Sequence, residues 1–155
     1  MYILETNSFK YYLGERLLFK LPALKLHTKS RIGLIGLNGS GKTTLLELLA
    51  GIRPIPAAAK IICKTTMTIL PQLKERLSKS GGETTQAYIL QALKQQSGLL
   101  LADEPTNHLD LDAVTALEEL LCNYPGTLIF TTHDRRLLKA IAKNLLVLSL
   151  IHISE

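Results

Sequence analysis

Short apolar runs separated by polar and turn-forming residues recur along the whole chain, and this pattern predicts many short strands. The runs in the first 35 residues are interrupted at Asn7-Ser8, Leu13-Gly14 and Pro22, which is typical of a small antiparallel sheet. Tyr11 and Tyr12 are expected in a turn of this sheet. Further runs predict strands over residues 32–35, 61–63, 67–70, 99–102, 127–132 and 145–148.

Between these strands, apolar residues recur at the three- and four-residue spacing that predicts helices. The expected helices cover residues 45–50, 84–95, 110–121 and 135–143. The strands over 32–35 and 99–102 consist of small or apolar residues, which indicates burial on both faces in a parallel sheet. The pattern therefore predicts an α/β fold, with a mixed, mostly parallel sheet flanked by helices and a small N-terminal antiparallel β layer.

Composition indicates how many domains the chain forms and which cellular compartment suits it. A chain of 155 residues with 46% hydrophobic residues suits one domain with a sizeable core. Cys63 and Cys122 lie far apart, with no cysteine or histidine at metal-ligand spacing, so a reduced, cytoplasmic setting is expected. No apolar run reaches the length of a bilayer span, so direct membrane insertion is not expected. The net charge of +5 comes from scattered basic residues, which could contact RNA phosphates or only form a solvated face.

The residues from Gly36 to Thr44 fit the phosphate-binding loop pattern G-x-x-x-x-G-K-[ST]. Their place between an expected strand and an expected helix favours this interpretation over a glycine-rich turn that only joins the two. In such a loop, backbone N–H groups and the helix N-terminus surround phosphate oxygens, the lysine reaches the β- and γ-phosphates, and the hydroxyl holds Mg²⁺. The residues expected to bind nucleotide here are Gly36, Asn38, Gly39, Ser40, Gly41, Lys42, Thr43 and Thr44.

Two carboxylates form the second chemical signal. Asp103 and Glu104 follow the apolar strand over 99–102, at the end where ligands bind in open α/β sheets. Asp103 is expected to bind Mg²⁺ and Glu104 to orient or deprotonate a water, with a pair of helix-capping acids as the alternative. His133 stands at the same end of the strand over 127–132 and is expected to sense the γ-phosphate, although a lone histidine is more often structural.

Taken in order, these residues resemble the nucleotide-binding domain of the ATP-binding cassette (ABC) family, which has a P-loop NTPase fold. Gly36 to Thr43 resembles the Walker A motif, and Leu99 to Asp103 resembles Walker B, with Glu104 as the catalytic glutamate. The other motifs that the resemblance implies are the Q-loop Gln72, the signature residues Ser80, Gly81, Gly82 and Glu83, the D-loop Asp110 and the switch histidine His133. Tyr12, or its neighbour Tyr11, matches the aromatic residue that stacks on adenine.

The sequence from Thr106 to Asp110, Thr-Asn-His-Leu-Asp, narrows the resemblance to the ABC-F branch, whose members lack membrane domains and act on the ribosome. The path of about eight residues from Gln72 to Ser80 leaves the helical subdomain that docks on transporters largely absent. This is similar to the first cassette of the antibiotic-resistance ABC-F proteins of the Vga, Lsa and Msr groups. Because ABC-F proteins carry two cassettes, residues 1–148 are expected to be one truncated cassette domain, and residues 149–155 a non-native tail.

The expected activity is hydrolysis of ATP to ADP and phosphate with Mg²⁺ as cofactor. On this interpretation the catalytic residues are Lys42, Gln72, Glu104 and His133, and the metal ligands are Thr43, Gln72 and Asp103. The resemblance implies that a signature motif closes over ATP held by another cassette, so full activity is expected to need a second cassette. The ribosome is the expected partner, through regions that this chain lacks. The alternatives are the ATPase subunit of a membrane transporter and a nucleotide-binding fragment without turnover.

Overall fold

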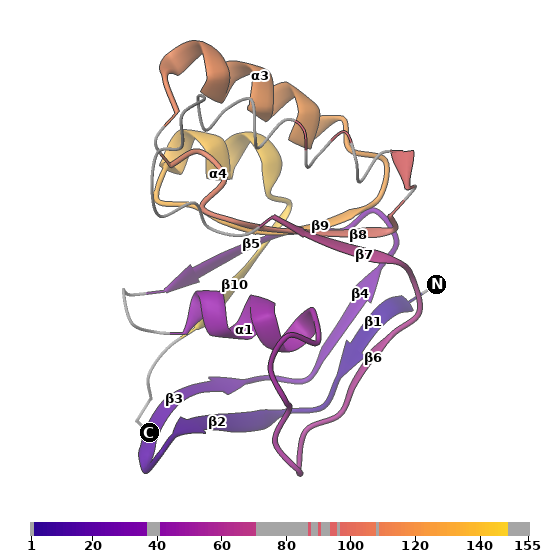
Figure 1. Ribbon diagram of the computed structural model, residues 1–155, viewed down its shortest axis with the longest axis vertical. Coiled ribbons are helices and arrows are strands. Elements are labelled where there is room, and N and C mark those ends of the chain that lie inside the picture. Colours follow the sequence, from indigo (N-terminus) through magenta and orange to yellow (C-terminus); the bar gives the residue numbers. More distant parts are fainter. Residues whose placement is uncertain are drawn as a thin grey trace.

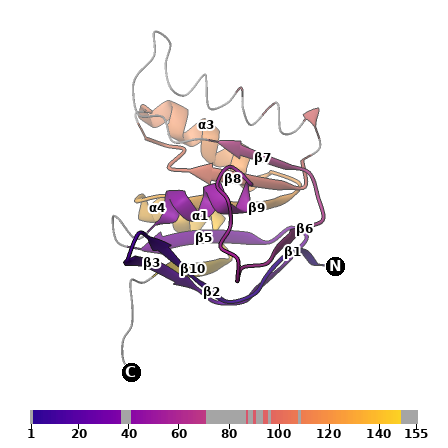
Figure 2. The ribbon, with the colours of Figure 1, turned by 60° about the horizontal axis from the view of Figure 1, so that its bottom comes forward.

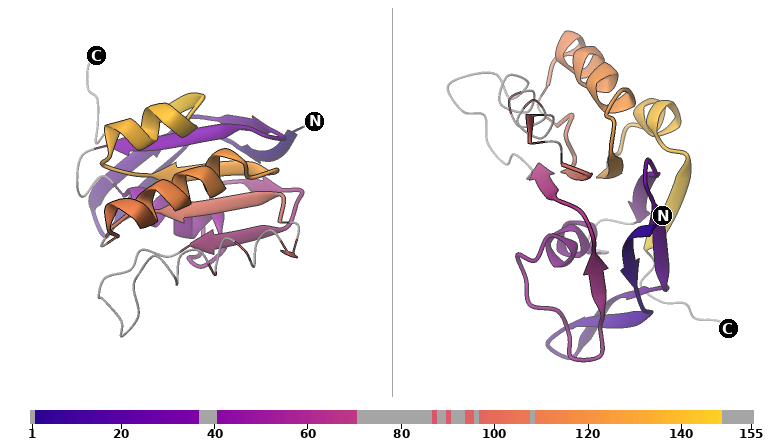
Figure 3. Two further views of the ribbon diagram at one scale, coloured as in Figure 1. Left: turned by 90° about the horizontal axis from the view of Figure 1, so that it is seen from above. Right: turned by 90° about the vertical axis from the view of Figure 1, so that its right-hand side faces the viewer.

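The computed structural model describes residues 2–36, 41–70, 87, 90, 94–95, 97–107 and 109–148. Its described strands form a parallel sheet and a set of antiparallel strands, with helix α1 (Lys42–Leu49) between the two layers (Figure 1). Helices α3 (Leu111–Cys122) and α4 (Arg135–Ile141) cover the opposite face of the parallel sheet and lie side by side (Figure 3). This arrangement confirms the predicted fold class.

The five described strands of the parallel sheet run in the order β10-β5-β9-β8-β7, and Figure 2 shows this order from the side of the antiparallel strands. Their bounds are Arg31–Gly36 (β5), Met67–Leu70 (β7), Leu99–Asp103 (β8), Thr127–Thr131 (β9) and Asn144–Leu148 (β10). All neighbouring pairs are parallel, so the carboxyl ends of these strands meet at one edge. The antiparallel strands form separate sheets rather than joining this one.

The antiparallel part consists of a three-stranded sheet of order β4-β1-β6 and the hairpin β2-β3. The strand bounds are Tyr2–Thr6 (β1), Phe9–Leu13 (β2), Arg16–Leu21 (β3), Leu24–His27 (β4) and Ile61–Cys63 (β6). The predicted N-terminal layer is confirmed, and β6 adds a strand from beyond the phosphate loop. It does so by pairing with β1, where Cys63 lies opposite Leu4.

Tyr11 and Tyr12 lie within β2, so the prediction that they occupy a turn is wrong. The turn consists of Gly14 and Glu15, between β2 and β3. Gly14 has a φ of 62°, in the left-handed region that glycine enters without the steric cost that other residues have. Because this glycine supplies the turn geometry, the chain before it can stay extended through both tyrosines.

The helices follow the predicted positions with shifted ends. Helix α1 begins at Lys42 rather than at residue 45, directly after Gly41 with a φ of 90°. Helix α3 begins after Asp110, whose carboxylate accepts a hydrogen bond from the backbone N–H of Ala113 and caps the helix. Helix α4 ends at Ile141, two residues before the predicted end. Among the described helices, none has both the length and the apolarity that crossing a membrane requires.

The core has two parts, one on each face of the parallel sheet. Strand β8 shows the division, because Leu99 and Leu101 belong to the part packed with α1 and the antiparallel strands, while Leu100 and Ala102 belong to the part under α3 and α4. Successive side chains of a strand point to opposite faces, so a strand in this position must be apolar throughout. This burial holds the carboxyl end of β8, and Asp103 with it, in a fixed place.

Several predicted features lie outside the described residues. These are the loop residues Asn38, Gly39 and Ser40, the Q-loop Gln72, the signature residues Ser80, Gly81, Gly82 and Glu83, and residues 149–155. The predicted helix over 84–95 is described only in part, and residues 87, 90 and 94 within it are helical.

Candidate active site

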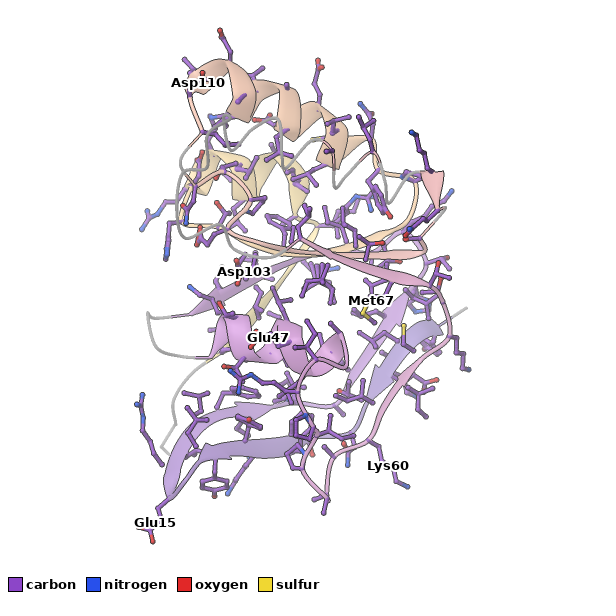
Figure 4. All side chains as sticks on the ribbon, in the orientation of Figure 1. Glu15, Glu47, Lys60, Met67, Asp103 and Asp110 are labelled. Atoms are coloured by element: carbon purple, nitrogen blue, oxygen red, sulfur yellow. The ribbon has the colours of Figure 1, made fainter. Side chains whose placement is uncertain are left out.

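A cavity of about 370 Å³ lies where the carboxyl ends of β8 and β9 meet the start of α1. Figure 4 shows Asp103 at this end of the sheet, near the helix that carries Glu47. The residues that line the cavity are Leu13, Arg16, Leu18, Gly41, Lys42, Thr43, Thr44, Asp103, Glu104 and His133. The cavity therefore collects residues from both predicted motifs and from the β2-β3 hairpin.

Asp103 is the most tightly held acidic group of the cavity. Its Oδ2 accepts a hydrogen bond of 2.7 Å from the Thr43 hydroxyl, and its Oδ1 accepts one of 2.8 Å from the Thr131 hydroxyl. Its side chain is buried, with a residue exposure of 4%. Because hydrogen bonds to a carboxylate are stronger than those between neutral groups, these two hydroxyls fix the orientation of the Asp103 carboxylate.

Thr131 connects the two acidic residues. Its hydroxyl oxygen donates to Asp103 and accepts a hydrogen bond of 2.8 Å from the backbone N–H of Glu104. The register of β8 and β9 makes this possible, because it sets Asp103 directly opposite Thr131. The backbone of Glu104 has a φ of 48°, in the left-handed region that is costly for residues other than glycine. Thr131 thus helps to hold Glu104 in a conformation that turns the chain at the edge of the sheet.

Glu104 and His133 form a pair across the cavity. Glu104 Oε1 lies 3.1 Å from His133 Nε2. Within the described part of the chain, Glu104 Oε1 is buried and no group satisfies it with a regular hydrogen bond. Burial raises the pKa of the Glu104 carboxyl above its ordinary value, and the charge of Asp103 adds to this effect, while His133 and Lys42 oppose it. A carboxyl group with a raised pKa is suited to accept and release a proton during a reaction.

Lys42 carries positive charge into the same cavity. Its Nζ donates a hydrogen bond of 3.0 Å to the backbone carbonyl of Gly36, at the end of β5. The lysine therefore joins the end of β5 to the start of α1, the two ends of the predicted phosphate-binding loop. From this position its charge also acts on Glu104.

The oxygen atoms at this site fit Mg²⁺. Asp103 and Thr43 bring a carboxylate and a hydroxyl within 2.7 Å of each other, and both are hard oxygen ligands of the kind that Mg²⁺ prefers. The described residues contain no group of three or more acidic, histidine or cysteine side chains that could hold a metal alone. Mg²⁺ in nucleotide sites usually keeps several waters and takes further ligands from substrate phosphates.

Comparisons with known proteins agree with this geometry. Residues 19–78 match the family model described as ABC transporter. A solved structure of a nucleotide-free ATP-binding cassette from an ABC transporter superposes with a TM-score of 0.78 at 15% identity, over 97% of this chain and 88% of that one. The chain folds as an ABC ATPase domain. A second structure, titled RNase-L Inhibitor, superposes with a TM-score of 0.80 at 20% identity, over 94% of this chain and 37% of that one.

The curated relatives that this chain resembles are longer proteins. The Haemophilus influenzae protein YheS is 32% identical over an alignment of 182 positions, gaps included. The alignment covers 88% of this chain and 28% of YheS. The Bacillus subtilis ribosome protection protein VmlR is 28% identical over 94% of this chain and 34% of its own length. This chain therefore spans about a third of the length of these two relatives.

The structure brings together the predicted residues Gly41, Lys42, Thr43, Thr44, Asp103, Glu104 and His133. It leaves Tyr12 outside the cavity lining, and it places Asp110 at the start of α3 as a helix cap. Sequence reasoning missed Thr131 and the hairpin residues Leu13, Arg16 and Leu18. Thr131 could have been suspected from its place one residue before Thr132-His133, but nothing in the sequence pattern points to the hairpin residues.

Proposed function

We propose that this cassette binds ATP with Mg²⁺ and hydrolyses it to ADP and phosphate. The observation that carries the proposal is the Asp103 carboxylate held between the hydroxyls of Thr43 and Thr131, with the Glu104–His133 pair in the same cavity. When bound, Mg²⁺ neutralises charge on the phosphate oxygens. Asp103 and Thr43 are the described residues that would hold it.

The chain's own residues then supply positioning and electrostatics, which account for most catalysis in phosphoryl transfer. Lys42 provides a positive charge for the β- and γ-phosphates. Glu104 orients the attacking water and accepts its proton when its carboxylate is ionised, because this carboxylate lines the cavity and its raised pKa makes it a stronger base. His133, through Nε2, holds the Glu104 carboxylate and donates to phosphate oxygens when it is released from that contact.

Two further parts of the proposal rest on residues outside the described ones. Gln72 acts as a sensor of the metal and the γ-phosphate, as its place in the sequence implies. The signature residues Ser80, Gly81, Gly82 and Glu83 act on ATP held by a second cassette, so each complete site combines two cassettes. A lone cassette then has half of each site.

The proposal is tested by phosphate release and nucleotide binding with and without Mg²⁺. We expect Asp103→Asn to lose most of the Mg²⁺-dependent hydrolysis, because an amide is a weaker metal ligand than a carboxylate. Asp112→Asn is the matched control, since Asp112 is an exposed acid in the first turn of α3. Equal hydrolysis by wild type and Asp103→Asn would contradict the proposal. Magnesium-dependent binding without any phosphate release, even with a second cassette present, would favour a nucleotide-binding module without turnover.

We also propose that the whole protein belongs to the ABC-F branch and acts in the cytoplasm on the ribosome, in protection against antibiotics. Two observations support this: the similarity to VmlR, which is named a ribosome protection protein, and the sequence Thr-Asn-His-Leu-Asp over residues 106–110. The alternative is the ATPase subunit of a transporter with separate membrane subunits, which the likeness to a transporter cassette favours. In ATP, a full-length Glu104→Gln protein should pellet with ribosomes. Recovery with membranes and their integral proteins instead would favour the transporter.

A further inference from the structure

The three-stranded sheet β4-β1-β6 has an inner face that belongs to the core and an outer face with a different set of side chains. Leu4 and Leu26 lie opposite each other on the inner face and belong to the core part that is packed with α1. Figure 1 shows the outer face turned away from α1, on the side of the molecule where the N-terminus lies. Because the core covers the inner face, a partner of this sheet would meet the outer one.

A bulge in β1 places Tyr2 on the outer face. Tyr2 lies opposite His27 on β4, and the register shifts before the next pair, at Leu4, so Ile3 is an extra residue in β1. Ile3 and Leu4 are both buried, although neighbouring residues of a regular strand point to opposite faces. A bulge of this kind redirects the side chains beside it. Tyr2 accordingly stands on the side of His27 and is 38% exposed.

Tyr2, His27 and Lys25 form a cluster on this face. The ring centroids of Tyr2 and His27 lie 4.3 Å apart, and Lys25 Nζ lies 5.3 Å from the centroid of the Tyr2 ring. Lys25 and His27 are exposed and two residues apart in β4, which sets them on the same face. These contacts hold an exposed aromatic ring in place beside a positive charge. Such a ring is suited to stacking on a nucleobase.

Further lysines follow the edge strand of the same face. Lys60, Ile62 and Lys64 are exposed, and the residues between them are partly buried, so the three side chains share the outer face. Figure 4 shows Lys60 pointing away from the molecule. Lys64 Nζ lies 3.7 Å from Oε2 of Glu5, an acidic side chain of this face. Because the lysines outnumber Glu5, the face is positively charged and attracts nucleic-acid phosphates.

We propose that the outer face of β4-β1-β6 binds single-stranded RNA, with an unpaired base stacked on the Tyr2–His27 pair and phosphates at Lys25 and Lys64. These four residues are not among those that line the cavity in the described part of the chain, so the surface is separate from the ATP site. The inference rests on the proposed action on the ribosome for the source of the RNA.

The combination of charge and aromatic rings favours this partner over two others. An acidic peptide would pair with the lysines but leave the Tyr2–His27 rings unused. Double-stranded RNA hides the faces of its bases within the helix, whereas an unpaired base can be splayed out and stacked on an aromatic side chain. A single strand therefore uses both the charge and the rings of this face.

The first test measures binding of the full chain to a labelled oligouridylate of about ten nucleotides, by fluorescence anisotropy without ATP. Tyr2→Ala should weaken binding about tenfold, the effect of one lost stacking contact, and Tyr2→Phe should restore most of it. Tyr12→Ala is the matched control, because Tyr12 is 48% exposed but lies in the β2-β3 hairpin, and it should bind like wild type. Because Tyr2 is partly exposed, its substitution is not expected to unfold the protein.

The second test measures how binding depends on salt. Each phosphate contact to a single strand contributes about 0.7 to the slope of log affinity against log salt concentration. We expect Lys25→Gln to lower the magnitude of this slope by about 0.7. Lys139→Gln, at an exposed position in α4, should leave it unchanged. Equal slopes in wild type and Lys25→Gln would remove Lys25 from the contact and overturn the inference.

The remaining outcomes separate this inference from the proposed function. Equal losses in Tyr2→Ala and Tyr12→Ala overturn it, as does duplex RNA that binds as tightly as the single strand. Displacement of the oligonucleotide by an equal concentration of polyglutamate assigns the face to an acidic protein instead. If the chain does not bind the oligonucleotide while full-length Glu104→Gln protein pellets with ribosomes in ATP, only this inference fails. Specific oligonucleotide binding without pelleting supports the RNA face and contradicts the proposed action on the ribosome.

Discussion

At the scale of single residues, Thr131 holds Asp103 and Glu104 in place without lining the cavity. It is fully buried, and its hydroxyl joins the Asp103 carboxylate to the backbone of Glu104. Thr127, at the other end of the same strand, is also buried, but its hydroxyl donates to the His27 carbonyl and accepts from the backbone N–H of Lys29. The two threonines thus form a matched pair at opposite ends of β9.

Replacing Thr131 with valine should reduce both stability and Mg²⁺ dependence. The substitution keeps the shape but removes a hydrogen bond to a buried carboxylate, which costs about 2 kcal/mol in free energy of unfolding. The freed Asp103 carboxylate should also hold Mg²⁺ less well. Thr127→Val should cost about 1 kcal/mol and leave the Mg²⁺ requirement for phosphate release unchanged. Equal Mg²⁺ titrations of phosphate release in both variants would show that Thr131 does not position Asp103.

The raised pKa of Glu104 predicts two pH effects of opposite sign. At pH values between the ordinary and the raised pKa, Glu104 binds more protons in the folded protein than in the unfolded chain. The free energy of unfolding therefore falls as pH rises through this window. Hydrolysis should instead fall as pH drops through the raised pKa, because the carboxylate must be ionised to accept a proton.

Unfolding by denaturant at several pH values checks the first effect. The gain in free energy of unfolding from Glu104→Gln should be larger above the window than below it. A gain that does not change with pH would indicate an ordinary pKa for Glu104. The rate of phosphate release by the wild-type protein across the same pH range checks the second effect.

Asp103 and Glu104 could be predicted from the sequence, whereas the contact of Thr131 with Asp103 could not. A strand that is apolar at every position must be buried on both faces, so its first polar residues mark the edge where ligands bind. The contact with Thr131 depends on the register of β8 against β9, which the sequence pattern leaves open. The same holds for Leu13, because the irregular pairing after Tyr11 decides which side chain reaches the cavity.

At the scale of elements, helix α4 positions His133. The helix begins directly after Asp134, whose carboxylate accepts hydrogen bonds from the backbone N–H groups of Arg136 and Leu137. Leu137 then anchors the helix in the core beneath α3. The cap and this anchor fix the residue just before the helix, at the end of β9, where His133 meets Glu104.

Removal of the cap should therefore affect both stability and turnover. We expect Asp134→Ala to cost about 1 kcal/mol in free energy of unfolding and to lower the rate of phosphate release, because the start of α4 frays. Asp134→Ser keeps a capping acceptor and should restore most of both. Thermal unfolding and phosphate release measure the two effects. A serine variant as impaired in turnover as the alanine variant would indicate that the Asp134 charge, rather than the cap, supports His133.

The elements themselves were largely predictable, and their partners were less so. Apolar periodicity located the strands and helices because each must bury one stripe or face. It could not show that β6 pairs with β1 on the far side of the phosphate loop, since pairing between distant segments depends on the whole topology. The helix ends differ from the predicted ends by a few residues, because caps such as Asp110 and Gly41 set them locally.

At the scale of the whole molecule, the residues that line the cavity all come from this one chain, whereas the proposed reaction also needs the signature residues of a second cassette. If a second cassette must close this site, the isolated chain should bind ATP with Mg²⁺ and release phosphate slowly. Its specific rate should rise with protein concentration, as copies pair. Phosphate release combined with light scattering measures this. A high rate in a strictly monomeric sample would contradict the need for a second cassette.

The most direct test of the account compares ATP binding and phosphate release in wild type and Glu104→Gln, in the full-length protein with Mg²⁺. The amide fills the same space but cannot accept the proton of the attacking water. We expect Glu104→Gln to bind ATP as tightly as wild type and to release phosphate at least about a hundredfold more slowly. Phosphate release at the wild-type rate by Glu104→Gln would contradict the assignment of this cavity as an ATPase site.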